Sequence, residues 1–167
     1  MPADFEAVFR RLYPRARAVA YRIVGEVAEA EDAAAEAFSR TLLAWRRVGD
    51  LPYLDAWVLR VTANVAVDVV RRRRPAPLAT LTSEAVPGPD EVVVLRMALA
   101  AALAALPRRQ REVVALRYLV GLREDEVARS MGVSLGSVKR HGHRALARLR
   151  RRLGTDWDWA ATAGSEG

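Results

Sequence analysis

The chain has 167 residues, half of them hydrophobic, which is enough for one medium domain or two small ones with buried cores. It has no cysteine, which excludes disulfides, cysteine-ligated zinc and thiol catalysis, and its two histidines are poor material for a metal site. The formal net charge is +7, and 13 basic but only four acidic residues fall between residues 107 and 153. A positive surplus concentrated in one segment is typical of nucleic-acid binding.

Apolar residues recur at every third or fourth position between residues 4 and 24, which predicts an amphipathic helix. Pro14 lies inside this helix and is expected to bend or divide it, and Gly25 is expected to end it. A second helix is predicted over about 27–47, because its acidic first half and basic end suit the helix dipole. Its inward residues are expected to be Ala30, Ala34, Phe38, Leu42 and Trp45.

Pro52 opens a third predicted helix, which runs to about Arg73. One flank of this helix carries two aromatic rings, an amide and two guanidinium groups, from Tyr53, Trp57, Arg60, Asn64 and Arg71. Such a line can hold an unpaired nucleic-acid strand, because rings stack on bases and arginines bind phosphates. The same residues also fit the rim of a hydrophobic core, and taken alone they favour this plainer interpretation.

The segment 75–89 contains four prolines and predicts a flexible linker. The predicted fold is therefore all-α, with two small helical domains at 1–74 and 90–153 and a flexible acidic tail at 154–167. Within the second domain, helices are expected at about 90–105 and 107–119.

Residues 122–153 predict a helix-turn-helix. A short helix carries acids in its first turn, Gly132 allows the chain to turn, and Ser134 is a natural N-cap for a second helix that ends near Leu153. One stripe of the second helix is expected to face inward, and the opposite arc is basic. This layout is typical of a helix that enters the major groove of DNA. A surface helix with a solvated basic face is the plainer alternative, but turn, cap, periodicity and one-sided charge occur together and favour DNA binding.

Two parts of the chain together resemble bacterial RNA polymerase sigma factors. Residues 29–74 resemble their second conserved region through Ala30-Glu31-Asp32, Glu36, Phe38, Trp45, Ala56-Trp57, Arg60, Asn64, Ala66, Asp68 and the arginine run after Val70. Residues 106–153 resemble the fourth region through Leu106-Pro107, Gln110, Glu112-Val113, Tyr118, Gly121-Leu122, Glu126-Val127-Ala128, Gly132-Val133-Ser134, Gly136, Val138-Lys139 and Arg144-Ala145. Only a short linker separates the two parts, which is similar to the extracytoplasmic-function (ECF) group.

The resemblance implies a factor that binds core RNA polymerase and directs promoter recognition, strand opening and transcription initiation. It implies docking on the β′ clamp helices of the polymerase through Glu31, Asp32, Glu36 and Phe38, and it implies the β flap as a further contact. It implies capture of the melted minus-ten strand by Tyr53, Trp57, Arg60, Asn64, Arg71 and Arg72. It implies recognition of the minus-thirty-five duplex by Ser134, Gly136, Ser137, Lys139, Arg140, His143 and Arg144. An anti-sigma factor is a further partner that the family allows, and the free chain is expected to be a monomer.

Three positions depart from the family pattern. Ala35 stands where the family usually has glutamine, and Arg123 stands where serine or threonine often caps a helix, a cap whose loss costs about 1 kcal/mol. Gly142 replaces an inward leucine, and glycine inside a helix costs up to about 1 kcal/mol relative to alanine. The family's promoter preference therefore does not transfer to this chain.

Two other classes of function remain as alternatives. The first is a stand-alone helix-turn-helix transcriptional regulator, which would form a homodimer and bind duplex DNA by itself. The second is an enzyme acting on nucleic acid, in which Glu29, Glu31, Asp32 and Glu36 would imitate a metal cluster; a docking face at a helix N-terminus explains these acids more simply. We therefore expect no catalytic residue, metal or cofactor.

No apolar run suffices to span a membrane and the start is not a signal peptide, so we expect a cytoplasmic protein without direct membrane contact.

Overall fold

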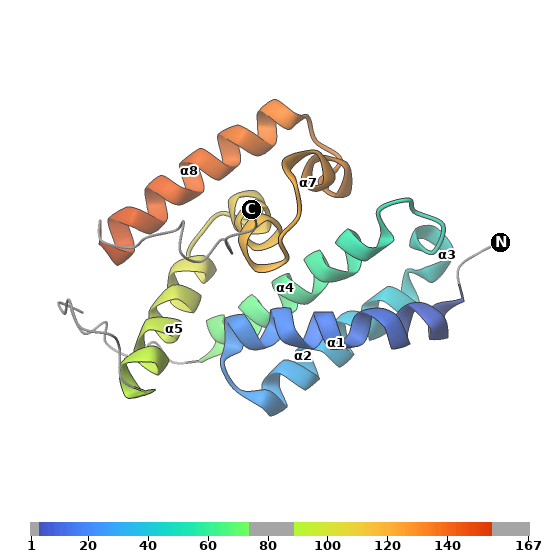
Figure 1. Cartoon of the computed structure of the whole chain (residues 1–167), viewed down its shortest axis with the longest axis horizontal. Coiled ribbons are helices and arrows are strands. Elements are labelled where there is room, and N and C mark those ends of the chain that lie inside the picture. Colours follow the sequence, from blue (N-terminus) through green and yellow to red (C-terminus); the bar gives the residue numbers. More distant parts are fainter. Residues whose placement is uncertain (1–3, 74–88, 155–167) are drawn as a thin grey trace, which may run out of the picture.

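The structure, a computed structural model, describes residues 4–73 and 89–154, and side chains in the second range from residue 93 onward. These residues form helices and contain no strand, which confirms the predicted all-α class (Figure 1). The predicted linker 75–89 lies outside the described residues except for Pro89, which begins a helix, and the predicted tail lies outside them beyond Gly154.

The first region consists of α1 (Phe5–Val24), α2 (Val27–Leu43), the single turn α3 (Trp45–Val48) and α4 (Leu54–Arg72). Asp4 caps α1 by accepting a hydrogen bond from the backbone N–H of Glu6, and Gly25 ends it with φ 78°, as predicted. Pro14 does not divide α1, which continues through it. Proline removes one hydrogen bond from a helix interior, and here the apolar face on both sides of Pro14 is packed into the core, which holds the helix together.

The second helix is shorter than predicted. It ends at Leu43, and α3 follows as a separate turn. Leu42, expected to face inward, is 54% exposed, whereas Thr41 is fully buried and donates its hydroxyl to the carbonyl of Ala37. The inward stripe drifts around the helix, because 3.6 residues per turn do not match a strict spacing of four. The position after Thr41 therefore turns toward solvent.

Phe38 lies in an aromatic cluster that joins α1 and α2. Its ring centroid lies 4.9 Å from that of Phe9 and 6.3 Å from that of Phe5, and both pairs meet edge to face. Phe5 also meets Trp45 edge to face at 5.2 Å. Edge-to-face pairs are worth about 0.5–1.5 kcal/mol beyond area burial, so this cluster fixes the angle between the two helices.

The second region consists of α5 (Pro89–Ala104), α6 (Arg108–Val114), the wider π-helical turn η1 (Ala115–Leu119), α7 (Glu124–Met131) and α8 (Leu135–Leu153). The predicted helix over 107–119 is thus interrupted by a π-helical turn, in which the N–H of Val120 bonds to the carbonyl of Ala115. Helix α8 packs on α6 and α7, and a small cluster of buried residues joins α5, α6 and α8, including Leu103, Val114 and Leu149.

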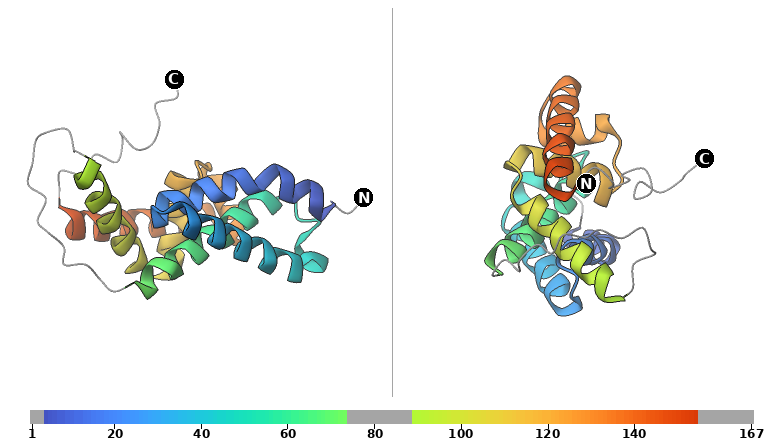
Figure 2. Two further views of the ribbon diagram at one scale, coloured as in Figure 1. Left: turned by 90° about the horizontal axis from the view of Figure 1, so that it is seen from below. Right: turned by 90° about the vertical axis from the view of Figure 1, so that its left-hand side faces the viewer.

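The two regions pack directly on each other (Figures 1 and 2). Helix α4 touches α5, α6, η1 and α7, and α1 touches α5. One continuous apolar cluster contains residues of α1, α2 and α4 together with Val113, Leu116, Val127 and Met131 of the second region. In the right-hand view of Figure 2, α8 and α2 lie on opposite sides of this common core.

Gly142 faces α6 from inside α8. A methyl group at this position would lie 3.5 Å from Cγ1 of Val113, which is ordinary van der Waals contact, and the backbone of Gly142 does not have positive φ. Val113 is therefore the side chain that a methyl group at this position would meet.

We predict that Gly142→Ala raises the free energy of unfolding by about 0.5–1 kcal/mol, because alanine is the better helix former and fits beside Val113. Denaturant unfolding of both proteins measures this difference. Gly132→Ala is the matched control and should be destabilising, because Gly132 has φ 64°. A lower unfolding midpoint for Gly142→Ala would show that α8 and α6 pack more tightly than described.

Candidate nucleic-acid interface

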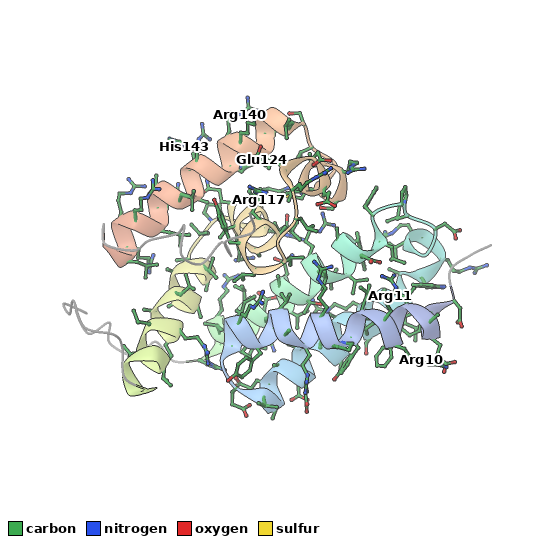
Figure 3. The ribbon with its side chains drawn as sticks, in the orientation of Figure 1. Arg10, Arg11, Arg117, Glu124, Arg140 and His143 are labelled. Carbon is green, nitrogen blue, oxygen red and sulfur yellow. The ribbon has the colours of Figure 1, made fainter. Side chains whose placement is uncertain are left out.

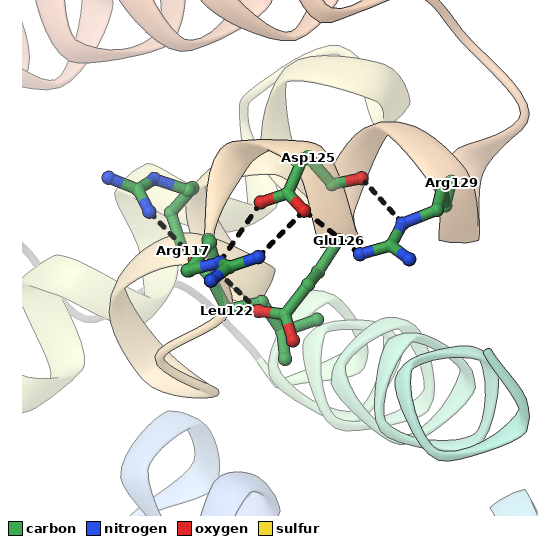
Figure 4. Close-up of polar contacts among 6 residues, drawn as sticks. Arg117, Leu122, Asp125, Glu126 and Arg129 are labelled. Atoms are coloured by element: carbon green, nitrogen blue, oxygen red, sulfur yellow. Dashed lines mark hydrogen bonds and ion pairs between the residues drawn. The ribbon is translucent and has the colours of Figure 1, made fainter.

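Helix α7 begins without a side-chain cap from Arg123, as predicted. Instead, Glu126 Oε2 accepts a hydrogen bond from the backbone N–H of Arg123 at 2.8 Å, which satisfies one N–H at the start of the helix. Asp125 pairs with both Arg123 and Arg129, and Arg117 donates to the carbonyl of Leu122 at 2.7 Å (Figure 4). The hydrogen bond from Arg123 lowers the pKa of Asp125, so this carboxylate remains charged beside its partners.

The turn between α7 and α8 has the predicted geometry. Gly132 adopts φ 64° and ends α7, and Ser134 Oγ accepts a hydrogen bond from the backbone N–H of Ser137 at 3.2 Å. Val138, Ala145 and Leu149 are buried, which confirms the predicted inward stripe of α8. The helix-turn-helix is therefore formed by the residues that the sequence indicated.

The predicted minus-thirty-five residues lie together along the first half of α8. Lys139, Arg140, His143 and Arg144 are exposed, and Figure 3 shows Arg140 and His143 on the outer side of the helix, away from the first region. Arg140 also donates to Ser137 Oγ at 3.1 Å, close to the capping hydroxyl of Ser134. Ser134 and Gly136 are exposed and Ser137 is half-buried, so backbone N–H groups, hydroxyls and cations are offered on one open surface.

The predicted minus-ten residues of α4 are in a different situation. Tyr53, Trp57 and Arg60 are half-buried and line a cleft of about 500 Å³ between the two regions. The opposite wall comes from the second region and includes Arg108, Arg109, Glu112 and Ser130. Sequence reasoning missed this wall, because its residues are 48 or more positions away in the chain and carry no local pattern that points to α4.

The polar groups of this flank bond to the second region. Arg60 donates through Nη1 to the carbonyl oxygen of Ser130 at 2.8 Å, and Asn64 donates through Nδ2 to Oε1 of Glu112 at 3.0 Å. Burial lowers the pKa of the Arg60 guanidinium, which the nearby carboxylate of Glu112 partly offsets. The rim interpretation of Trp57 and Tyr53 thus fits this arrangement, in which α4 meets the second region.

The last two residues of this predicted set lie apart from the cleft. Arg71 and Arg72 are exposed on the last turn of α4, and Nη1 of Arg71 lies 3.8 Å from a carboxylate oxygen of Asp68. They extend the flank as accessible cations and do not line the cleft.

The predicted docking residues of α2 divide into two groups. Glu31, Asp32 and Glu36 are exposed; Glu31 pairs with Arg17 at 3.1 Å and Glu36 with Arg40 at 2.8 Å. Phe38 is only 2% exposed, so its assignment as a docking residue is wrong: its ring fills the aromatic cluster and cannot reach a partner.

An apolar pair that the sequence analysis did not single out lies on the same helix. Leu42 is 54% exposed and Leu43 is 89% exposed, which is unusual for adjacent leucines. Isolated exposed leucines are common, but two adjacent ones beside a row of acids form a candidate contact surface. The drift of the inward stripe past Thr41 was the signal that could have revealed them.

No group of three or more histidine, cysteine, aspartate or glutamate side chains suited to a metal ion occurs within residues 4–73 and 89–154. The acids at the start of α2 therefore do not form a metal cluster in this structure. In the same described ranges, no helix is long and apolar enough to cross a membrane.

The exposed basic helix α8 follows a tight turn after α7, and this arrangement is that of a DNA-binding protein of the helix-turn-helix class. Comparison with known families identifies the family within this class. Residues 8–76 match the family described as Sigma-70 region 2, and residues 96–149 match the family described as Sigma-70, region 4.

Individual relatives agree with these matches. The chain is 32% identical to the RNA polymerase sigma-E factor of Streptomyces coelicolor over 90% of this chain and 86% of that protein. It is 33% identical to the ECF RNA polymerase sigma factor SigM of Mycobacterium tuberculosis over 90% of this chain and 77% of the relative. Among solved structures, CnrH in complex with the cytosolic domain of CnrY matches with a TM-score of 0.60 and 26% identity, over 92% of this chain and 89% of that one.

The chain therefore belongs to the sigma-70 family of RNA polymerase sigma factors, in its extracytoplasmic-function group. It is a promoter-recognising sigma factor that acts with core RNA polymerase, and the alternative of a stand-alone regulator is set aside.

Proposed function

We propose that this sigma factor recognises the minus-thirty-five element with the first half of α8. The observation that carries this proposal is the open basic surface there, where Lys139, Arg140, His143 and Arg144 are exposed together beside the capped helix start. Arginine and lysine bind guanine edges and phosphates, while Ser134, Ser137 and the backbone at Gly136 suit phosphates at a helix N-terminus.

The flank of α4 is our candidate for capturing the melted minus-ten strand. Tyr53 and Trp57 supply stacking surfaces, Asn64 supplies an amide for base edges, and Arg60, with Arg71 and Arg72 farther along, supplies cations for phosphates. An extruded base costs a few kcal/mol of unstacking, and a binding site that holds it offsets this cost.

We assign docking on core polymerase to the exposed face of α2. The carboxylates of Glu31, Asp32 and Glu36 offer negative charge, and Leu42 and Leu43 offer apolar area beside them. Interfaces commonly combine apolar and polar area, and this face offers both. The β′ clamp helices and the β flap are the expected contacts on the polymerase.

The domain division that fits these roles is a polymerase-docking and minus-ten domain at 1–74, a linker at 75–89, a minus-thirty-five domain at 90–153 and a tail at 154–167. Because the two DNA-binding domains belong to one chain, binding of the first to the promoter makes binding of the second effectively intramolecular. In this proposal the protein is not an enzyme, needs no cofactor and acts in the cytoplasm as a monomer until it meets the polymerase. An anti-sigma factor is a further expected partner.

Run-off transcription with core polymerase over a library of promoters tests the proposal as a whole. We expect transcripts from a subset of promoters that share two sequence elements. Core polymerase alone is the control. An absence of transcripts, under conditions in which a known sigma factor is active, would overturn the proposal.

We predict that the double variant Asp32→Ala/Leu43→Ala binds core polymerase about tenfold more weakly, since an interface residue that contributes strongly costs more than about 1 kcal/mol when truncated. Its stability should be unchanged, because both side chains are exposed. Val93→Ala, an exposed apolar residue of α5, is the control. Phe38→Ala should instead lower the free energy of unfolding by about 3–5 kcal/mol. Unchanged co-purification of the double variant would place docking elsewhere.

We predict that Arg140→Ala weakens binding to a minus-thirty-five duplex and reduces the slope of log affinity against log salt by about 1, because one phosphate contact is lost. Titration of the duplex at several salt concentrations measures this slope. Arg46→Ala removes the same charge from an exposed position on α3 and should leave the slope unchanged. An unchanged slope for Arg140→Ala would mean that Arg140 contacts no phosphate.

A further inference from the structure

A groove of about 270 Å³ lies between α5 and the last turns of α8. The two helices pack on each other there, at the end of α8 that is farther from the turn of the helix-turn-helix (Figure 1). One wall of the groove, here called the apolar wall, consists of Ala102, Ala105 and Leu106. The other, the basic wall, consists of Arg148, Arg151 and Arg152. None of these six residues belongs to a surface assigned above.

The apolar wall continues along one side of α5. The exposed large hydrophobic residues of this helix are Val93, Val94 and Met97. Steps of four residues keep Val93, Met97 and Ala105 on the same side of a helix, so the exposed side leads into the groove. Arg96 is the only polar residue between positions 93 and 106, and it packs over an aromatic ring of α1. A helix that is apolar all round is normally covered all round, so this side calls for a partner.

The basic wall has no counter-ion among the described residues. Arg148, Arg151 and Arg152 are exposed, and none of them forms an ion pair with another described residue. Neither α8 nor the stretch 93–106 contains an aspartate or a glutamate. Three cations within two helical turns repel one another, and an anion placed between them is attracted by all three.

The sequence after α8 carries side chains that complement both walls. Residues 155–167 contain three acidic residues and no basic one, and they hold two of the four tryptophans of the chain. Asp156, Trp157, Asp158 and Trp159 alternate acid and ring. In an extended segment, successive side chains point to opposite sides. Both rings then face one wall of a groove while both carboxylates face the other.

The position of Gly154 brings this segment to the groove. Its backbone N–H still bonds within α8, and its φ of 92° is a conformation that favours glycine and turns the chain away from the helix. Four extended residues span about 13 Å, whereas the rise of α8 from Arg148 to Gly154 is about 9 Å. The segment is therefore long enough to return along the groove to Arg148.

The spacing of the acids also matches that of the arginines. Asp156 and Asp158 lie about 6.6 Å apart in an extended segment. Arg148 and Arg152 are separated by a rise of about 6 Å along a helix. Two ion pairs can therefore form together.

We propose that residues 155–167 dock into the groove between α5 and α8, with Trp157 and Trp159 on the apolar wall and Asp156 and Asp158 on the basic wall. The docked segment takes the place of the flexible tail expected from the sequence. A segment of the same chain is favoured over a second copy, because it begins beside the groove and its effective concentration there is high.

Docking changes which cations of α8 are available to DNA. The carboxylates occupy the arginines of the basic wall, which would otherwise bind phosphates of any sequence. Duplex contact is then confined to the first half of α8, where Lys139, Arg140, His143 and Arg144 stay exposed. This consequence rests on the proposed duplex-binding role of α8, whereas the docking itself does not.

Fluorine NMR of the full chain labelled with 5-fluorotryptophan tests the docking. Trp157→Phe and Trp159→Phe assign the two signals, and a labelled synthetic peptide of residues 155–167 gives their free positions. We expect both signals of the full chain to differ from those of the peptide. They should not change with protein concentration.

Charge reversal tests the basic wall. Arg148→Glu/Arg152→Glu should lower the ratio of docked to free segment about tenfold, because repulsion replaces two partly exposed ion pairs. Adding Asp156→Arg/Asp158→Arg to this variant should restore docking, because the pairs are re-formed with exchanged charges. Arg46→Glu/Arg47→Glu, which reverses two exposed charges of α3, is the control and should leave both signals in place.

A charge placed in the apolar wall tests the other side of the groove. Ala105→Glu should move both signals toward the positions of the peptide, because the rings lose an apolar surface to a carboxylate that also repels the acids of the segment. Ala7→Glu, at an exposed position of α1, is the matched control and should have no effect.

Duplex binding tests the consequence. Asp156→Asn/Asp158→Asn should bind a duplex of random sequence more tightly than the natural sequence does. Its slope of log affinity against log salt should be steeper by about 2, because freed arginines reach phosphates. Glu166→Gln removes an acid outside the alternating motif and should leave the slope unchanged.

Signals of the full chain at the positions of the peptide would overturn the docking. Signals that shift with concentration would assign the groove to a second copy and overturn the intrachain contact. Failure of the exchanged charges to restore docking would overturn the pairing, and an equal salt slope would overturn the effect on DNA. The NMR measurement needs neither polymerase nor promoter. A docked segment in a chain that is inactive in run-off transcription would therefore contradict the proposed function alone.

Discussion

The packing of α4 between two sets of helices is the constraint on which the rest of the structure depends. On one side α4 buries Val58, Leu59 and Ala66 with α1 and α2, which makes the first region a stable unit. On its other side it meets α5, α6, η1 and α7, and Leu116 and Val127 complete the same apolar cluster. A helix that buries two sides leaves few orientations for its polar flank, so Arg60 and Asn64 must bond to whatever covers them.

This arrangement explains how the polar flank of α4 is satisfied in the folded chain. Half-buried arginine and asparagine side chains lose water when covered, and the burial that lowers the pKa of Arg60 is one sign of that loss. The loss is tolerable only where acceptors replace the water, and Ser130 and Glu112 supply them. Phosphates and base edges are acceptors of the same kind. The flank that we propose for the unpaired strand is therefore also suited to a protein segment that offers carbonyl and carboxylate oxygens.

Helix α8 shows the opposite case. Its inward stripe is filled within the second region by α6 and α7, so no further protein is needed to cover it. Lys139, Arg140, His143 and Arg144 on its other side are exposed, and packing such cations against protein would require acidic partners. Charged side chains are almost never fully buried unless they are paired, which agrees with their exposure here.

The amino-acid sequence determined the features that depend on neighbours a few residues away. Gly132 and Ser134 set the turn and cap between α7 and α8, and the spacing of Val138, Ala145 and Leu149 fixed which side of α8 faces inward. These features depend on positions two to seven residues apart, so a local pattern is sufficient to predict them.

The tertiary structure alone decided what covers each helix. Arg15 donates a hydrogen bond to the carbonyl of Val120, 105 positions away, and Arg60 donates one to the carbonyl of Ser130, 70 positions away. No local periodicity in the sequence carries information over such separations. The same limit explains Phe38: its apolar type predicts an inward position or a docking contact, and only the rings of α1 that pack on it decide between the two. The type of a side chain and its position in the sequence determine which groups it can bind. Which of these groups it contacts in the folded protein depends on how the whole chain packs.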